Sequence, residues 1–268
     1  MTSKNPQRSS LSNGAAFQVS GSGEPVVLLH VVGLRSEAWT PQMETLSRQW
    51  RVYAFDLPGH GQSQLTAQRA DLSDYVAWLR ESLGLLDEGP VNIAGHSMGA
   101  LIALGITVEN PSMVRRMAML NGVYRRSAEA SEAVSARAAQ IRCGNMNIQQ
   151  PLDRWFTDAA SDQSARVRTE RMLAGVEPKA YATAYGAFAR GDAVYADRVP
   201  EIACPALFLT GDGDHNSTAQ MAREMAEAAP HGEARIIEGH RHMVALTAPS
   251  IVNEALTSWL GRRIHDNV

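Results

Sequence analysis

The chain has 268 residues, of which 44% are hydrophobic, and a formal charge of −3. This hydrophobic content is enough to fill a large core, so an extensively disordered chain is excluded. The nearly balanced charge gives no general electrostatic reason to bind nucleic acid or an anionic membrane surface, and we expect a small-molecule substrate instead.

The N-terminal segment, Met1 to Gly14, is polar and lacks the apolar run of a secretory signal, and no stretch approaches the length of a membrane span. We therefore predict a cytoplasmic protein without a membrane partner. The two cysteines, Cys143 and Cys204, are far apart and stand in no common metal or redox spacing, which fits a reducing compartment. We expect no cofactor and leave a homodimer open.

Short apolar runs alternate with segments of helical period, a pattern typical of parallel strands joined by crossover helices. The predicted strands are Val26 to His30, Arg51 to Asp56, Val91 to Gly95, Val114 to Leu120, Pro205 to Thr210 and Ala234 to Glu238. The predicted helices are Leu72 to Leu86, with Asp71 as N-cap, then Ala100 to Val108, Ser217 to Ala229 and Pro249 to Gly261. The predicted fold class is α/β, with a doubly wound, mostly parallel sheet and flanking helices.

The stretch from about Gly122 to Arg198 breaks this alternation, because it is helical and rich in Ala, Arg and aromatic residues. We interpret it as a helical cap inserted over the carboxyl edge of the sheet, where open α/β sheets bind ligands. The predicted domains are a core of residues 1–121 and 199–268 and a cap of residues 122–198. The alternative is a run of ordinary surface helices on the flank of the sheet.

A candidate nucleophile lies in the motif Gly95-His96-Ser97-Met98-Gly99. It follows a predicted strand and opens a predicted helix, which is the context of a G-x-S-x-G nucleophile elbow. Residues without a Cβ let strand and helix approach closely around an exposed hydroxyl. The alternatives are a tight turn and a phosphate loop, but a phosphate loop requires Gly-Lys-Ser/Thr, which is absent here.

Three further motifs follow the elbow pattern in a recognisable order. They are Asp56 to Ser63 (DLPGHGQS), Thr210 to Asp214 (TGDGD) and Glu238 to His242 (EGHRH). With the elbow, they make the chain similar to the α/β-hydrolase superfamily from about Phe17 to Leu260. The first of the three resembles a turn of that family, and we interpret it as structural.

The resemblance implies a catalytic triad of Ser97, Asp214 and His242, in the chain order of this fold. Asp214 stands three residues after Gly211, as the family's acid does, and Asp212 is its competitor, with a turn-forming role as the alternative. His242 closes a Gly-x-x-His pattern. His240 does not match it and is interpreted as structural or pocket-lining. A metal site on the two histidines lacks further ligands, so we predict no metal.

The resemblance also implies an oxyanion hole formed by the backbone N–H groups of Met98 and Val32. The loop after the first predicted strand reads His30-Val31-Val32-Gly33. Most relatives carry glycine where this chain has Val31, and a β-branched residue tolerates fewer backbone conformations. We therefore expect either an altered hole or a narrower acyl pocket.

The implied activity is hydrolysis of a small carboxylic ester or lactone through an acyl-enzyme on Ser97. The alternative is hydrolysis of a carbon–carbon bond in a ring-cleavage product, which we rank second because that branch usually has Asn before the serine and a Gly-rich anion loop. A different class, a ligand-binding, receptor-like member with little turnover, is disfavoured by the complete triad.

The substrate pocket is predicted to draw on residues near the triad and in the cap, namely His30, Val31, His96, Trp155, Phe156, Tyr185 and His240. Core packing explains the aromatic residues of the cap about as well. Arg125, Arg126 and Arg154 could clamp a substrate carboxylate, but a solvated helical surface is the simpler interpretation of these arginines.

Overall fold

A single sheet of eight strands runs through residues 6–65 and 69–262, the part of the chain that the computed structural model describes. The strand order is β1-β2-β4-β3-β5-β6-β7-β8. β1 pairs with β2 and β2 with β4 in antiparallel fashion, and all other neighbours are parallel. The strands are β1 (Gln7–Ser10), β2 (Ala16–Ser20), β3 (Pro25–Leu29), β4 (Arg51–Phe55), β5 (Val91–His96), β6 (Val114–Leu120), β7 (Ala206–Gly211) and β8 (Gly232–Ile237).

Each predicted strand is present within two residues of its predicted bounds. The central strands are apolar on both faces, because neighbouring side chains point to opposite sides of the sheet. In β3, Val27 and Leu29 belong to one hydrophobic core, and Val26 and Leu28 belong to the other. A sheet with two buried faces needs a helical layer on each of them.

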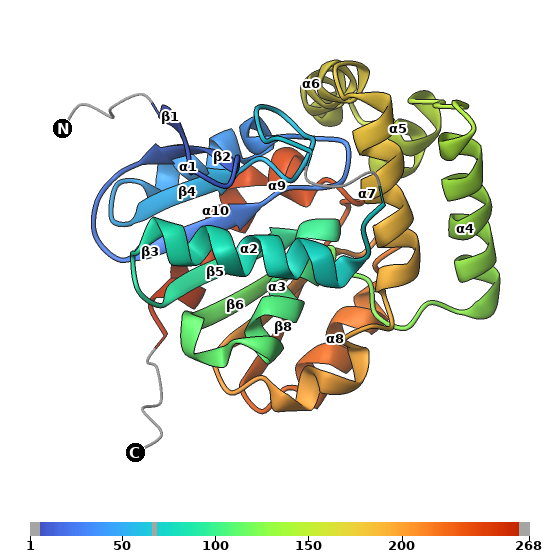
Figure 1. The fold of residues 1–268 in the computed structure, drawn as a ribbon. Coiled ribbons are helices and arrows are strands. Elements are labelled where there is room, and N and C mark those ends of the chain that lie inside the picture. The colour runs from blue at the N-terminus through green and yellow to red at the C-terminus, as the bar shows by residue number, and fades with distance from the viewer. Residues whose placement is uncertain (1–5, 66–68, 263–268) are drawn as a thin grey trace.

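Helices supply both layers. The first layer is α2 (Leu72–Leu86), α3 (Met98–Glu109) and α8 (Ala219–Ala228), and the second is α1 (Thr40–Leu46), α9 (Val244–Thr247) and α10 (Pro249–Leu260). Figure 1 shows α2 and α3 in front of the sheet and α10 behind it. Helix α2 begins after Asp71, whose N–H donates to the Asp74 carboxylate at 2.8 Å. The predicted doubly wound architecture is therefore correct.

Between β6 and β7 the chain forms a group of helices without a strand. They are α4 (Ala128–Arg142), α5 (Gln149–Trp155), α6 (Gln163–Ala174) and α7 (Pro178–Gly191). The group lies together at one side of the molecule (Figure 1). This is the predicted insertion; its division from the core at residues 122 and 198 remains a prediction, and the outer core limits, 1 and 268, lie outside the described residues.

The sequence did not predict β1, β2 or α1. β1 is exposed at every position, so its strand pairing depends on backbone hydrogen bonds and leaves no apolar pattern. Helix α1 has only seven residues, too few for a clear helical period. Short 3₁₀ turns join the remaining elements, at Ser36–Trp39, Pro111–Met113, Ala160–Asp162 and Ala196–Glu201. Within the described residues, no helix combines the length and apolarity needed to cross a membrane.

Candidate active site

Ser97 stands on a sharp turn between β5 and α3. Its backbone has φ 57° and ψ −112°, a conformation that residues with a side chain rarely adopt. A Cβ on Gly95 would lie 2.0 Å from the carbonyl oxygen of Gly99, and one on Gly99 would lie 2.3 Å from that of Leu29. Both glycines are therefore required by close backbone approach, as expected for an elbow.

His242 and Asp214 face each other on the loops that follow β8 and β7. The Nδ1 atom of His242 lies 2.7 Å from Oδ2 of Asp214, and both side chains are buried. The other carboxylate oxygen of Asp214 accepts from the backbone N–H groups of Asn216 and Ser217. Burial alone would raise the pKa of Asp214, but His242 and these donors hold it below its ordinary value. The carboxylate therefore stays ionised beside the imidazole.

The competitor, Asp212, has a different position. Its Oδ1 accepts from the N–H of Gly239 at 2.8 Å, and the residue is exposed. It stabilises the turn and does not contact His242, as its alternative role predicted.

Asn121, at the end of β6, was not singled out from the sequence. Its Nδ2 donates to Oδ2 of Asp214 at 2.8 Å and to Thr210 at 3.0 Å. Its backbone has φ 47°, a left-handed conformation that Asn tolerates better than most residues. The sequence feature that could have identified Asn121 is its position directly after a buried strand, at the sheet edge where the other candidate residues lie.

One pocket contains both Ser97 and His242, beneath the cap helices. Its polar lining is completed by Asn216 and three arginines, and its apolar and aromatic lining consists of Val32, Val134, Trp155, Tyr185 and Phe188. Met98, the predicted donor beside Val32, is the first residue of α3 and is buried next to Ser97. The structure thus brings together Ser97, His242, Val32, Trp155 and Tyr185 in one cavity.

The loop that carries Val32 is held from behind by two histidines. His30 donates from Nδ1 to the carbonyl of Val31 at 2.7 Å and accepts at Nε2 from the N–H of Leu57 at 2.9 Å. His60 accepts at Nε2 from the N–H of Gly33 at 3.0 Å. Burial is the main cause that lowers the pKa of His30, and it is also the main cause that lowers the pKa of His60 to about 3. Both rings are therefore neutral when they make these hydrogen bonds.

His30 and Val31 are therefore not pocket residues, contrary to the prediction. Both are fully buried and neither lines the cavity. The left-handed conformation in this loop falls on Gly33, with φ +84°, and not on Val31. The valine consequently needs no strained backbone, and it does not narrow the pocket.

Three more predicted pocket residues lie outside the cavity. His96 donates from Nε2 to the carbonyl of His242 at 2.7 Å, His240 contacts Thr247 at 2.9 Å, and Phe156 is buried at the end of α5. His96 and His240 are engaged in these hydrogen bonds, and Phe156 packs in the core. Trp155, in contrast, stacks on His242, with 5.6 Å between the ring centroids and 25° between the planes.

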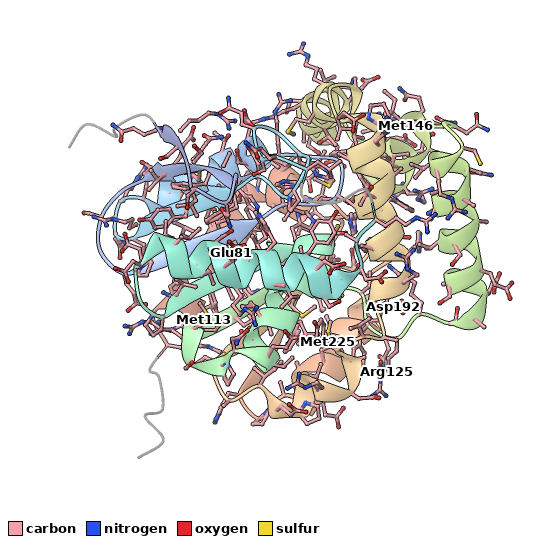
Figure 2. The ribbon with its side chains drawn as sticks, in the orientation of Figure 1. Glu81, Met113, Arg125, Met146, Asp192 and Met225 are labelled. Carbon is pink, nitrogen blue, oxygen red and sulfur yellow. The ribbon has the colours of Figure 1, made fainter. Side chains whose placement is uncertain are left out.

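The arginines of the cap separate into two groups. Arg125 is exposed and pairs with Asp197 on the surface, whereas Arg126 and Arg154 line the pocket, joined by Arg137, which was not singled out from the sequence. The interpretation of a purely solvated surface is therefore wrong for Arg126 and Arg154. Figure 2 labels Arg125 and also Asp192, the partner of Arg126 at the end of α7.

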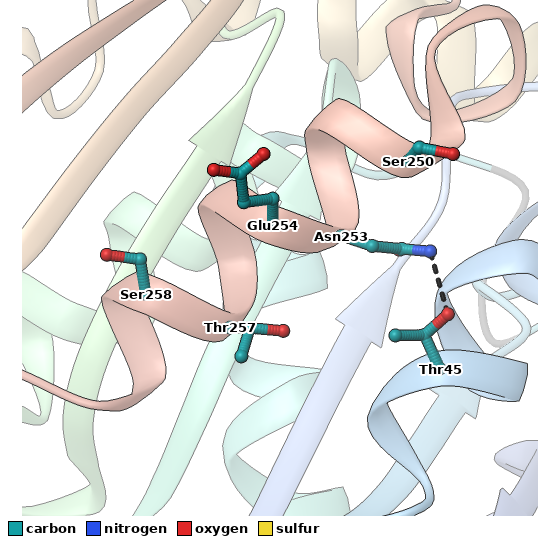
Figure 3. Close-up of a pocket in the computed structure, with 6 residues that line it drawn as sticks. All are labelled: Thr45, Ser250, Asn253, Glu254, Thr257 and Ser258. Carbon is teal, nitrogen blue, oxygen red and sulfur yellow. Dashed lines mark hydrogen bonds between the residues drawn. The ribbon is translucent and has the colours of Figure 1, made fainter.

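A second depression lies across α1 and α10 and is shown in Figure 3. It is lined by polar side chains, among them Glu254, and Asn253 donates to Thr45 there at 2.9 Å. None of Ser97, Asp214 and His242 lines it. Among residues 6–65 and 69–262, no three His, Cys, Asp or Glu side chains cluster closely enough to hold a metal ion.

Comparison with known proteins gives a family and a near relative. The model of the alpha/beta hydrolase family matches residues 26–255. An (E)-2-((N-methylformamido)methylene)succinate hydrolase from Acinetobacter baylyi is 49% identical over 260 residues, which cover 97% of this chain and 98% of the relative.

Solved structures agree on the fold. An esterase from Thermogutta terrifontis has a TM-score of 0.84 at 24% identity, over 95% of this chain and 98% of its own. An enol-lactonase from Burkholderia xenovorans has a TM-score of 0.85 at 22% identity, over 96% of this chain and 100% of its own. At these identities the two structures support the fold and not a substrate.

The family and the relative make this chain a hydrolase. Of the two activities predicted from the sequence, the comparison favours the alternative, because the compound in the relative's name contains neither an ester nor a lactone. Elbow, sheet order and family match all lead to one assignment: the chain belongs to the alpha/beta hydrolase family.

Proposed function

We propose that this chain hydrolyses a small unsaturated dicarboxylic acid of the kind named for the Acinetobacter relative. The observation that carries the proposal is 49% identity over nearly the full length of both chains. The named compound contains a formamido group, which is an amide, and a carbonyl of this kind can be attacked by an activated serine. Ser97 and His242, which share a pocket, supply the nucleophile and the base.

The reaction follows from these positions. Ser97 attacks the formyl carbon while His242 takes its proton, and Asp214 holds the imidazole from behind at 2.7 Å. The N–H groups of Met98 and Val32 stabilise the oxyanion. The intermediate collapses when His242 protonates the leaving nitrogen. Water, deprotonated by His242, then cleaves the formyl ester, which releases formate and restores Ser97.

The second candidate is cleavage of a carbon–carbon bond, the alternative predicted from the sequence. The same relative supports it, because its compound is a branched unsaturated acid without an ester or a lactone. The two courses differ in their products. Amide cleavage releases formate and an enamine, whereas carbon–carbon cleavage divides the skeleton, leaves the formamide bond intact and releases no formate.

The test is incubation with (E)-2-((N-methylformamido)methylene)succinate in ¹⁸O-labelled water, followed by mass spectrometry of the products. We expect formate carrying one ¹⁸O atom from the parent protein and none from the Ser97→Ala variant. A divided carbon skeleton with the formamide bond intact and no labelled formate would support the second candidate. Turnover of simple esters or lactones without turnover of this compound would refute the proposal and restore the first prediction.

A further inference from the structure

The pocket around Ser97 carries an excess of positive charge. Arg126, Arg137 and Arg154 line it, whereas none of its lining residues in the described part of the chain is an Asp or Glu. Arginine remains protonated in proteins, so three cations line the pocket that contains the Ser97 hydroxyl. Gathering like charges where water is restricted costs free energy unless an anion pairs with them.

The guanidinium of Arg126 is fixed by Asp192 through Nη1, and its Nη2 remains available as a donor. Its Nη1 donates to Asp192 at 2.8 Å, and its backbone N–H donates to the same carboxylate at 2.8 Å. Its side chain is only 3% exposed and lies against Phe188, with Cζ 4.5 Å from the ring centroid. Its Nη2 is buried without a hydrogen-bond partner in the described structure. A guanidinium donor without a protein partner can donate to an anionic oxygen that enters the pocket.

Arg137 and Arg154 have no carboxylate partner among the described residues. Arg137 donates from Nη1 to the hydroxyl of Tyr185 at 3.0 Å, and Nε of Arg154 is buried without any partner. Burial and then the neighbouring Arg137 lower the pKa of Arg154, as expected for a cation without a counterion. Asp192 balances one of the three charges, so two remain.

We propose that Arg126, Arg137 and Arg154 form a subsite for the two carboxylates of the substrate and select dicarboxylic acids over monocarboxylic and neutral compounds. This inference deepens the proposed function and rests on it for the bond that Ser97 attacks. Guanidinium groups suit the task because each can donate two parallel hydrogen bonds to a carboxylate. Val134 and Phe188 contribute apolar walls for the carbon chain between the charges.

Binding of succinate and of butyrate, which has the same chain length and one carboxylate, tests the subsite without any turnover. Calorimetry in a Ser97→Ala background compares Arg137→Met and Arg154→Met with Arg125→Met. Arg125 is the matched control, because it is exposed and paired with Asp197 outside the pocket. Arg154→Lys keeps the positive charge and therefore distinguishes the effect of charge from the effect of packing. Circular dichroism verifies that each variant is folded.

We expect succinate to bind at least about 10-fold more tightly than butyrate, which corresponds to about 1.4 kcal/mol, because butyrate lacks the second carboxylate. Arg137→Met and Arg154→Met should each weaken succinate binding about 10-fold, Arg154→Lys less, and Arg125→Met not at all. Equal binding of the two acids, or unchanged binding in the folded methionine variants, overturns the subsite. Failure to hydrolyse the formamido compound would refute the proposed function and leave this binding result standing.

Discussion

The Nε2–H group of His96 donates a hydrogen bond to the backbone carbonyl of His242, 2.7 Å away. The residue before Ser97 therefore holds the segment that carries His242, the proposed base. Burial and, to a lesser degree, the neighbouring His242 lower the pKa of His96 to about 3, which keeps the ring neutral at ordinary pH. His96 is a positioning residue in this arrangement.

We predict that His96→Ala lowers kcat about 10- to 100-fold and changes KM little, because a small displacement of the base slows proton transfer without removing a substrate contact. His96→Gln retains an N–H donor and should recover part of kcat. Steady-state kinetics of both variants check this. Equal rates for His96→Ala and the parent would show that the hydrogen bond does not position the base.

The buried histidines should make the protein sensitive to acid. His30, His60 and His96 have a pKa lowered by burial, to about 3 for His60 and His96, whereas an exposed histidine titrates near 6.5. Between these values the unfolded chain binds more protons than the folded chain, so stability falls as pH drops below about 6.5. His60 and His96, whose pKa is about 3, should each cost on the order of 1 kcal/mol at pH 5.5 relative to pH 7.5, and His30 should act in the same direction.

Urea unfolding at the two pH values measures this loss. Replacement of His60 by Gln should reduce the difference in the free energy of unfolding between the two pH values by the contribution of His60. The control is His215→Gln, which makes the same replacement at an exposed position. A free energy of unfolding that is the same at pH 5.5 and pH 7.5 would contradict the expectation.

The two aspartates after β7 provide a matched pair. Asp214→Asn should lower kcat by roughly 10³- to 10⁴-fold, because an amide favours the wrong imidazole tautomer and no longer stabilises the imidazolium. Asp212→Asn should stay close to the parent rate, because Asp212 accepts only from the Gly239 N–H at a turn. Single-turnover rates distinguish them. A larger loss of rate for Asp212→Asn than for Asp214→Asn would contradict the assignment of Asp214 as the acid.

Trp155, at the end of α5, stacks on His242, the proposed base. Trp155→Ala should cost about 3–5 kcal/mol of stability, as buried aromatic truncations do, and lower kcat as the imidazole gains freedom. Trp155→Phe keeps a stacking ring and should retain most of kcat. The comparison variant is Trp259→Phe, in the core on the other face of the sheet, which should reduce stability and leave kcat unaltered. Thermal unfolding and kinetics read out both effects.

The sequence predicted the parallel strands because their apolar runs are buried on both faces, and it predicted Ser97, Asp214 and His242 because ordered local motifs carry them. Strand β1 escaped notice because it is polar and exposed at every position. Asn121 escaped notice because its contact with Asp214 joins residues 93 positions apart, a separation that no local pattern reports.

Local motifs determined the fold class and the residues that carry the proposed chemistry, since turns and strands depend on near neighbours in the chain. Only the tertiary structure decided which side chains reach the pocket. His30, His96 and His240 make hydrogen bonds outside the pocket, whereas Arg126, Arg137 and Arg154 line the pocket that contains Ser97. The physical reason is that packing of the cap against the sheet, between segments distant in sequence, sets the direction of each side chain.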